Sequence, residues 1–98
     1  MRVKWLRQAL NNLDKEAEYI ARDNPDAAAR LVQQVARSVD RLAAYPASGR
    51  TGRVPRTREL MVPDTPYIIP YRVRGETVEI LRVFRPPENG PKSVEDRD

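Results

Sequence analysis

The chain has 98 residues, with 18 lysines and arginines against 14 acidic residues and a formal net charge of +4. This length predicts a single domain with one modest core. The chain contains no cysteine and no histidine, which excludes a disulfide, a thiolate metal site and catalysis by an imidazole base. No apolar run approaches the ~20 residues that span a bilayer, so we expect a cytoplasmic protein without a membrane partner.

The positive charge is concentrated in the first 85 residues. Residues 86–98 hold two basic and four acidic groups, a net of −2, which leaves a net of +6 for residues 1–85. A basic body predicts acidic partners such as nucleic acid, the ribosome or an acidic protein segment. The alternative is a charged surface that only keeps the protein soluble.

The first half of the chain has the pattern of a short strand followed by two helices. Residues 2–5 favour a strand. From Leu6 the apolar residues recur at steps of three and four, which predicts a helix that ends before Pro25. Asn24 and Pro25 are typical of the N-cap and first position of a second helix, which should end near Ala44. So short a connection predicts an antiparallel helix hairpin.

The second half favours a loop followed by strands. Residues 46–57 contain two glycines, two prolines and no acidic residue, which is typical of an open loop. Strands are predicted over 58–62, 67–73 and 77–84. The fold class is therefore α+β, with an N-terminal strand, an antiparallel helix hairpin and a three-stranded antiparallel sheet packed on the helices, in the order βααβββ. Residues 86–98 are polar and proline-rich, so we expect a disordered tail there.

Arginine forms the most informative pattern. Four arginines fall within nine residues without an intervening acid, namely Arg50, Arg53, Arg56 and Arg58. The rigid guanidinium fork suits phosphate, so we predict that this loop binds the phosphates of a target. The alternative is that each arginine solvates the loop or pairs with a nearby glutamate.

Arg58 and Glu59 are neighbours in a predicted strand, so their side chains point to opposite faces. One of them therefore points inward and needs a partner. The structural interpretation is a buried ion pair between Glu59 and Arg72 or Arg82. The functional alternative is a substrate-binding arginine that Glu59 holds in place.

Little in the sequence supports enzymatic chemistry. Tyr67 and Tyr71 share a strand face and are expected in the core with their hydroxyls at its rim, although stacking on a base is the alternative. We find no phosphate loop and no metal-ligand cluster, and therefore expect no cofactor and no metal. Cleavage of a phosphodiester would rest on positioning and on arginine charge. The candidate arginines for that reaction are Arg58, Arg72, Arg82 and Arg85.

Five segments, in this order and spacing, resemble the RelE/ParE toxin superfamily: residues 24–28, 42–50, 57–60, 66–73 and 80–84. The resemblance covers about residues 1–85, which we take as the toxin domain. It implies a toxin of a type II toxin–antitoxin module, a plasmid-stabilization type of system. It also implies a cognate antitoxin as partner and contact with operator DNA only through that antitoxin. The net charge of +6 on residues 1–85 suggests that an acidic, partly apolar antitoxin segment lies along the sheet and helix hairpin.

The superfamily includes RelE-like nucleases, which cut mRNA on the ribosome, and ParE-like poisons of DNA gyrase. Many relatives continue the last strand with a histidine, basic residues and a tryptophan, whereas Phe84 is followed here by Arg-Pro-Pro-Glu. Residues 59–61 replace the lysines of the nucleases, Ile68 replaces an arginine, and only Arg85 corresponds to a catalytic arginine. We therefore predict a non-enzymatic gyrase poison. The alternatives are a metal-independent, ribosome-dependent mRNA endonuclease and a binding module that has lost toxicity.

Overall fold

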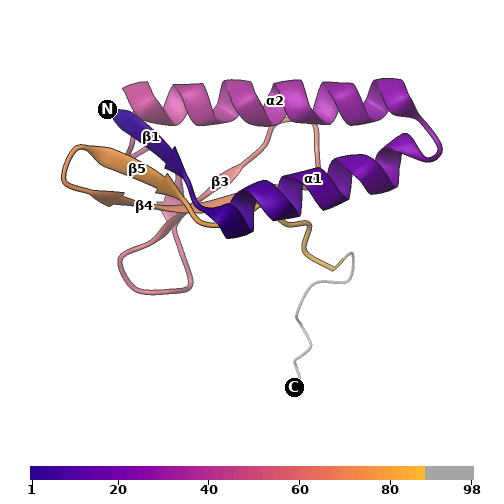
Figure 1. The fold of residues 1–98 in the computed structure, drawn as a ribbon. Coiled ribbons are helices and arrows are strands. Elements are labelled where there is room, and N and C mark those ends of the chain that lie inside the picture. The colour runs from indigo at the N-terminus through magenta and orange to yellow at the C-terminus, as the bar shows by residue number, and fades with distance from the viewer. Residues whose placement is uncertain (88–98) are drawn as a thin grey trace, which may run out of the picture.

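Within residues 1–87, which the computed structural model describes, the chain forms two helices and five strands (Figure 1). The helices are α1 (Arg7–Ala21) and α2 (Pro25–Ala44). The strands are β1 (Arg2–Trp5), β2 (Arg50–Thr51), β3 (Arg58–Met61), β4 (Ile68–Arg74) and β5 (Thr77–Ile80). The tail predicted over 86–98 lies outside the described residues, apart from its first two prolines.

The helices α1 and α2 run side by side as the expected hairpin (Figure 1). The turn between them is short because Asn24 begins the second helix directly. Its side-chain oxygen accepts a hydrogen bond from the Ala27 amide at 3.0 Å, and Pro25 occupies the first helical position. Within residues 1–87, neither helix has the length and apolar character needed to cross a membrane.

The strands form one mixed sheet in the order β1-β5-β4-β3-β2. The three predicted strands are β3, β4 and β5, and they pair antiparallel as expected. The N-terminal strand predicted over 2–5 is β1, but it was not placed in this sheet, and β2 was not predicted. β1 lies parallel to β5, with Val3 opposite Val78, and β2 adds antiparallel to β3. The sheet is therefore mixed, because the pair β1–β5 is parallel and the other pairs are antiparallel.

The last strand is shorter than predicted. β5 ends at Ile80, and the chain leaves the regular ladder before Phe84 pairs again with Ile68 of β4. Helix α1 contributes to this irregularity, because the side-chain oxygen of Asn12 accepts a hydrogen bond from the Val83 amide at 3.2 Å.

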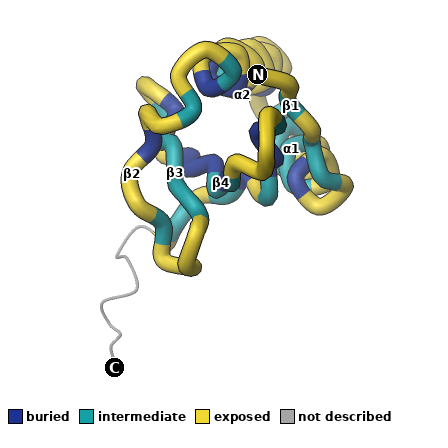
Figure 2. Tube along the Cα trace, turned by 90° about the vertical axis from the view of Figure 1, so that its left-hand side faces the viewer, coloured by how far each residue is buried: buried dark blue, intermediate teal, exposed yellow. Residues whose placement is uncertain are grey.

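One face of the sheet and the helix hairpin enclose the core (Figure 2). Strand residues alternate between the two faces, so the core residues of β4 and β5 are spaced two apart, although Glu79 between two of them is buried as well. The sheet contributes Ile69, Tyr71, Val78 and Ile80, and α2 contributes Leu31, Val35, Val39 and Leu42. Burying each of the larger aliphatic side chains stabilises the fold by roughly 1.5–3 kcal/mol. The opposite face carries charged residues from all five strands, and this charged face borders the site described next.

Candidate functional site

The arginine-rich segment 50–58 forms a closed hairpin rather than the open loop that its composition predicted. β2 pairs with β3 at its base, and the Gly52 amide donates to the Thr57 carbonyl oxygen at 2.9 Å. The Thr57 hydroxyl donates to the Val54 carbonyl oxygen at 2.6 Å. A Cβ on Gly52 would lie 2.4 Å from the Thr57 hydroxyl oxygen, so glycine permits this close approach. The hairpin holds residues 53–56 in solvent as its tip.

Arg56 has a left-handed backbone conformation, with φ of 65°. A residue with a side chain adopts this conformation at a cost of about 1 kcal/mol, because its Cβ approaches the following carbonyl oxygen. The hydrogen bonds that close the hairpin keep Arg56 in this conformation. Asp64, in the turn between β3 and β4, has a similar φ of 64°.

Arg50 and Arg58 are both bound to the protein's own groups. The Arg50 guanidinium lies 3.1 Å from a carboxylate oxygen of Glu59, whose side chain is only 12% exposed. These two residues stand directly opposite each other on β2 and β3. The Arg58 Nη1 donates to the Gly49 carbonyl oxygen at 2.8 Å and to the Ala47 carbonyl oxygen at 3.4 Å. Two of the four clustered arginines therefore hold the base of the hairpin.

Arg72 pairs with Glu79, which stands opposite it on β5, with 2.6 Å between Nε and Oε1. Arg74 lies 3.8 Å from the same oxygen. The hydrogen bond from Arg72 holds the pKa of the Glu79 carboxyl below its usual range, against the opposing effect of burial. The predicted pair of Glu59 with Arg72 or Arg82 was wrong, because the strand register places each glutamate opposite a different arginine. Arg82 is exposed in the segment after β5.

A hollow of about 300 Å³ lies between the hairpin and the end of β4. Its lining consists of Thr51, Arg56, Thr57, Arg58, Arg72 and Val73. Three arginines thus meet in one place, and no carboxylate belongs to this lining. The two threonines were not predicted as site residues, because the sequence of the hairpin that brings them together contains no two-residue turn motif.

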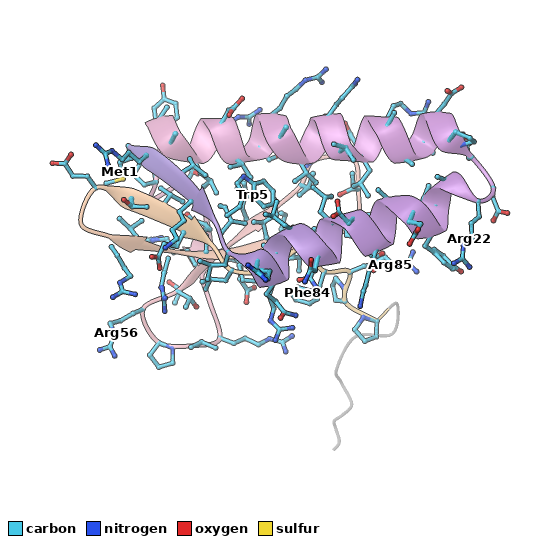
Figure 3. All side chains as sticks on the ribbon, in the orientation of Figure 1. Met1, Trp5, Arg22, Arg56, Phe84 and Arg85 are labelled. Atoms are coloured by element: carbon cyan, nitrogen blue, oxygen red, sulfur yellow. The ribbon has the colours of Figure 1, made fainter. Side chains whose placement is uncertain are left out.

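The four arginines proposed for a nuclease do not form one group. Arg58 and Arg72 line the hollow beside the hairpin. Arg85 lines another hollow, together with Pro66, Pro86 and Pro87. Figure 3 shows Arg85 below α1, well separated from Arg56 at the tip of the hairpin. The four arginines that were predicted to bind phosphate are also separated. Arg53 and Arg56 lie at the tip of the hairpin, and Arg50 and Arg58 lie at its base.

Tyr67 and Tyr71 are buried, as predicted. The Tyr71 hydroxyl donates to the Pro46 carbonyl oxygen at 2.7 Å. The Tyr67 hydroxyl donates to a carboxylate oxygen of Glu16 at 2.6 Å. Burial, this hydrogen bond and the charge of Glu16 raise the pKa of Tyr67 to about 12, although the charge of Arg85 opposes the shift. Both hydroxyls are engaged in structural contacts.

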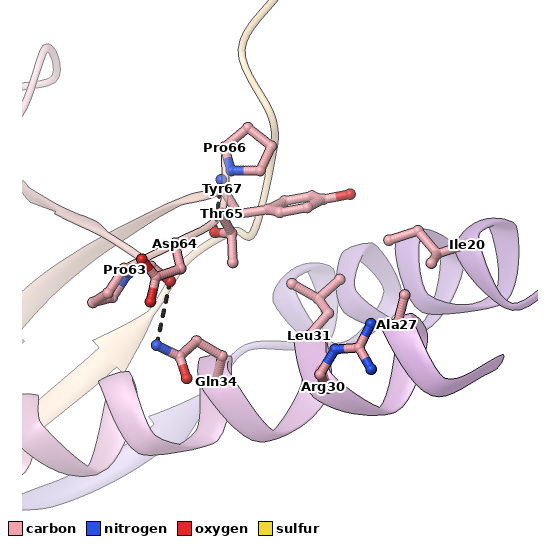
Figure 4. A pocket seen from close by; sticks show the side chains of 10 residues that line it. All are labelled: Ile20, Ala27, Arg30, Leu31, Gln34, Pro63, Asp64, Thr65, Pro66 and Tyr67. Carbon is pink, nitrogen blue, oxygen red and sulfur yellow. Dashed lines mark hydrogen bonds between the residues drawn. The ribbon is translucent and has the colours of Figure 1, made fainter. Parts of the chain in front are cut away.

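A separate groove of about 370 Å³ lies between the first half of α2 and the turn that joins β3 to β4 (Figure 4). Most of its lining is apolar, including Ile20, Leu31 and Tyr67. The Gln34 side chain closes one end by donating to the Pro63 carbonyl oxygen at 3.2 Å. Arg30 on α2 supplies the basic group in this lining, and Asp64 in the turn supplies an acidic one.

The fold and the hollow define a small, basic α+β protein in which a helix hairpin packs on a mixed sheet and arginines gather at one sheet edge. Residues 3–89 match the family model described as the ParE toxin of the type II toxin–antitoxin system parDE. The chain therefore belongs to the ParE toxin family, within the RelE/ParE superfamily, and it is the toxin of a type II toxin–antitoxin system.

Two curated relatives and one solved structure support this assignment. The protein Y4kP of Sinorhizobium fredii, named as a candidate toxin, is 50% identical over 91 residues, covering 93% of this chain and 94% of its own. Toxin RelE1 of Caulobacter vibrioides is 30% identical over 79 residues, covering 79% and 84%. A structure described as the chromosomal ParDE system from P. aeruginosa is 33% identical with a TM-score of 0.79, covering 87% and 95%. The family supports a cognate antitoxin as the partner.

Proposed function

We propose that this toxin is a ParE-like poison of DNA gyrase that acts in the cytoplasm and is not itself an enzyme. The observation that supports this choice is the dispersal of the nuclease candidates. Arg58 is bound to backbone carbonyl oxygens and Arg72 to Glu79, while Arg85 lies in a different hollow. A RelE-like nuclease needs these basic groups around one phosphodiester.

The two buried tyrosines are also poorly suited to act as the general acid or base of a nuclease. A general acid or base works best when its pKa lies near the operating pH. Tyr67 has a pKa of about 12 and donates to Glu16, and the Tyr71 hydroxyl is buried between two backbone groups. These facts favour a toxin that acts by binding.

A supercoiling assay with purified toxin and gyrase tests the proposal. We expect loss of supercoiling and accumulation of cleaved DNA, both reversed when the cognate antitoxin is added. The variant Arg85→Ala should inhibit gyrase as strongly as the unmodified toxin, because no catalytic arginine is required. Normal supercoiling without accumulation of cleaved DNA would contradict the proposal.

The second candidate function is ribosome-dependent mRNA cleavage. The identity to a relative named RelE1 and the meeting of Arg56, Arg58 and Arg72 in one hollow favour it. Primer extension on translating ribosomes would then show new 5′ ends, and Arg72→Ala, which removes one arginine of that hollow, would remove them. A toxin that has lost its activity would instead leave growth unaffected when it is expressed without the antitoxin.

We also propose that an acidic, partly apolar antitoxin segment lies along the sheet and helix hairpin and enters the groove beside Arg30. Binding to the native state stabilises it by about 2.7 kcal/mol at a partner concentration one hundred times Kd. Co-expression should therefore raise the solubility and Tm of the toxin. Arg30→Glu should weaken the complex, whereas Arg37→Glu, exposed on the same helix but outside the lining of the groove, should not.

A further inference from the structure

We propose that the hairpin tip, residues 53–56, and the hollow beside it form a binding site for the phosphate backbone of duplex DNA. This inference goes beyond the gyrase proposal, since it concerns a direct contact between the toxin and DNA, and it departs from the expectation that the toxin reaches operator DNA only through its antitoxin. It rests on the charge, the shape and the backbone conformation of the hairpin.

The charge of the hairpin is concentrated at its tip. Within residues 1–87, three ion pairs are present, and neither Arg53 nor Arg56 takes part in one. Both are exposed. Arg50, by contrast, is already paired with Glu59. An anion that approaches the hairpin therefore meets two guanidinium groups that need no release from a carboxylate.

The hollow beside the tip supplies the groups that bind phosphate in other proteins. Arginine side chains and threonine hydroxyls account for many of the contacts between proteins and DNA phosphates. Here Arg56, Arg58, Arg72 and the Thr51 hydroxyl line the hollow, whereas the Thr57 hydroxyl, also in the lining, already donates to the Val54 carbonyl oxygen. The hydrogen bonds to Gly49 and Glu79 use only part of the donors on Arg58 and Arg72, because each guanidinium carries five N–H groups. Donors remain for phosphate oxygens.

The backbone at the tip is held in an unfavourable conformation. Arg56 adopts a φ of 65°, a value at which glycine would avoid the steric cost. Strain of this kind persists where the surrounding structure enforces it, and it is concentrated at ligand-binding sites. Here the strained residue is also the one whose side chain joins the tip to the hollow.

Duplex DNA fits this surface better than a single strand. Proteins that bind single strands stack bases on aromatic side chains, and no aromatic residue lies between Tyr45 and Tyr67. A two-stranded ribbon, in contrast, has the size that the major groove of a duplex admits. Val54 at the tip is 63% exposed, so an apolar residue is also available to contact the groove.

The test measures binding of the full-length toxin to a fluorescently labelled duplex, by anisotropy, across a series of salt concentrations. Each phosphate contact contributes about 0.9 to the slope of log affinity against log salt. The double variant Arg53→Ala/Arg56→Gly should lower that slope by about 1.8. Glycine at position 56 suits the observed φ, so the variant should keep its circular dichroism spectrum and its Tm.

Two control variants separate a local site from general charge. Arg22→Ala/Arg37→Ala removes the same charge, and Figure 3 places Arg22 at the end of the molecule opposite Arg56. Asp64→Gly relieves the same backbone strain in another turn without removing an arginine. Both controls should keep the slope of the unmodified toxin. An equal fall in the arginine control, an unchanged slope in the tip variant, or no duplex binding at all would overturn the proposal.

Competitors identify the ligand class. Unlabelled duplex should displace the probe, whereas single-stranded RNA of equal length or an acidic peptide should displace it poorly; preference for either would overturn the assignment to DNA. The gyrase assay is independent of this result. If the unmodified toxin bound duplex through its tip but left supercoiling normal, only the gyrase proposal would fail. If it inhibited gyrase while the tip variant bound duplex unchanged, only this inference would fail.

Discussion

The Tyr71 hydroxyl accepts a hydrogen bond from the Gly49 amide at 2.9 Å and so ties the centre of the sheet to the start of β2. The same hydroxyl donates to the Pro46 carbonyl oxygen, and Tyr71 is fully buried. One phenolic oxygen thus fixes the path of the chain from the end of α2 into the arginine hairpin. The position of the candidate site depends on this contact.

Replacing Tyr71 with Phe tests that dependence. The variant loses both hydrogen bonds and leaves the buried Gly49 amide and the partly buried Pro46 carbonyl without these partners, which should lower the free energy of unfolding by about 1–3 kcal/mol. Urea unfolding at neutral pH measures the change. Tyr19→Phe is the control, because Tyr19 is exposed on α1 and should tolerate the change. Equal stability of the two variants would show that the hydroxyl is not a structural anchor.

Gly49 should tolerate no side chain. A Cβ at this position would lie 2.7 Å from the Tyr71 ring and hydroxyl and 2.8 Å from the Glu59 carbonyl oxygen. Gly49→Ala should therefore lower the free energy of unfolding by roughly 1–3 kcal/mol through overpacking. Gly75→Ala is a useful comparison, since nothing lies near its Cβ and only its φ of 59° opposes the substitution. Thermal unfolding should show the lower Tm for the variant at position 49.

Glu79 should make stability depend on acid pH. Because Arg72 holds the folded-state pKa of this carboxyl below its ordinary value of 4.5, ionised Glu79 stabilises the fold above that value. The stabilisation is lost as the pH falls through the folded-state pKa. The Tm of Glu79→Gln should thus lie below that of the unmodified protein at neutral pH, and the gap should narrow in acid. A constant gap, or one as large for Glu76→Gln on the exposed turn, contradicts the assignment.

Tyr67 should ionise late and weaken the fold at alkaline pH. Its pKa is about 12 against an ordinary 10.0, so the protonated hydroxyl contributes stability that is fully present below 10 and is lost as the pH rises toward 12. Subtracting the phenolate absorbance of Tyr67→Phe from that of the unmodified protein isolates this group. Glu16→Gln should move its pKa down toward 10, since it removes the carboxylate charge. An unchanged titration in that variant would show that Glu16 is not a cause.

The sequence predicted elements whose signals are local. Asn24 and Pro25 located the start of α2, and the change from a helical to a two-residue period located β3, β4 and β5. The two edge strands of the sheet were harder to predict. β2 consists of two residues in a loop-like segment, and the pairing of β1 with β5 carries no local signal, since it joins opposite ends of the described chain.

For the candidate site, too, the sequence predicted the features that depend on local residues and did not predict those that depend on strand pairing. The sequence by itself determined the basic character, the absence of imidazole and thiol chemistry, the helix hairpin and the resemblance to the toxin superfamily, because each depends on composition or on neighbouring residues. Only the tertiary structure decided which arginines are paired. The strand register sets Arg50 against Glu59 and Arg72 against Glu79, and leaves Arg53 and Arg56 exposed at the hairpin tip. Register is fixed by packing and pairing across the whole sheet, and no single segment of the chain contains it.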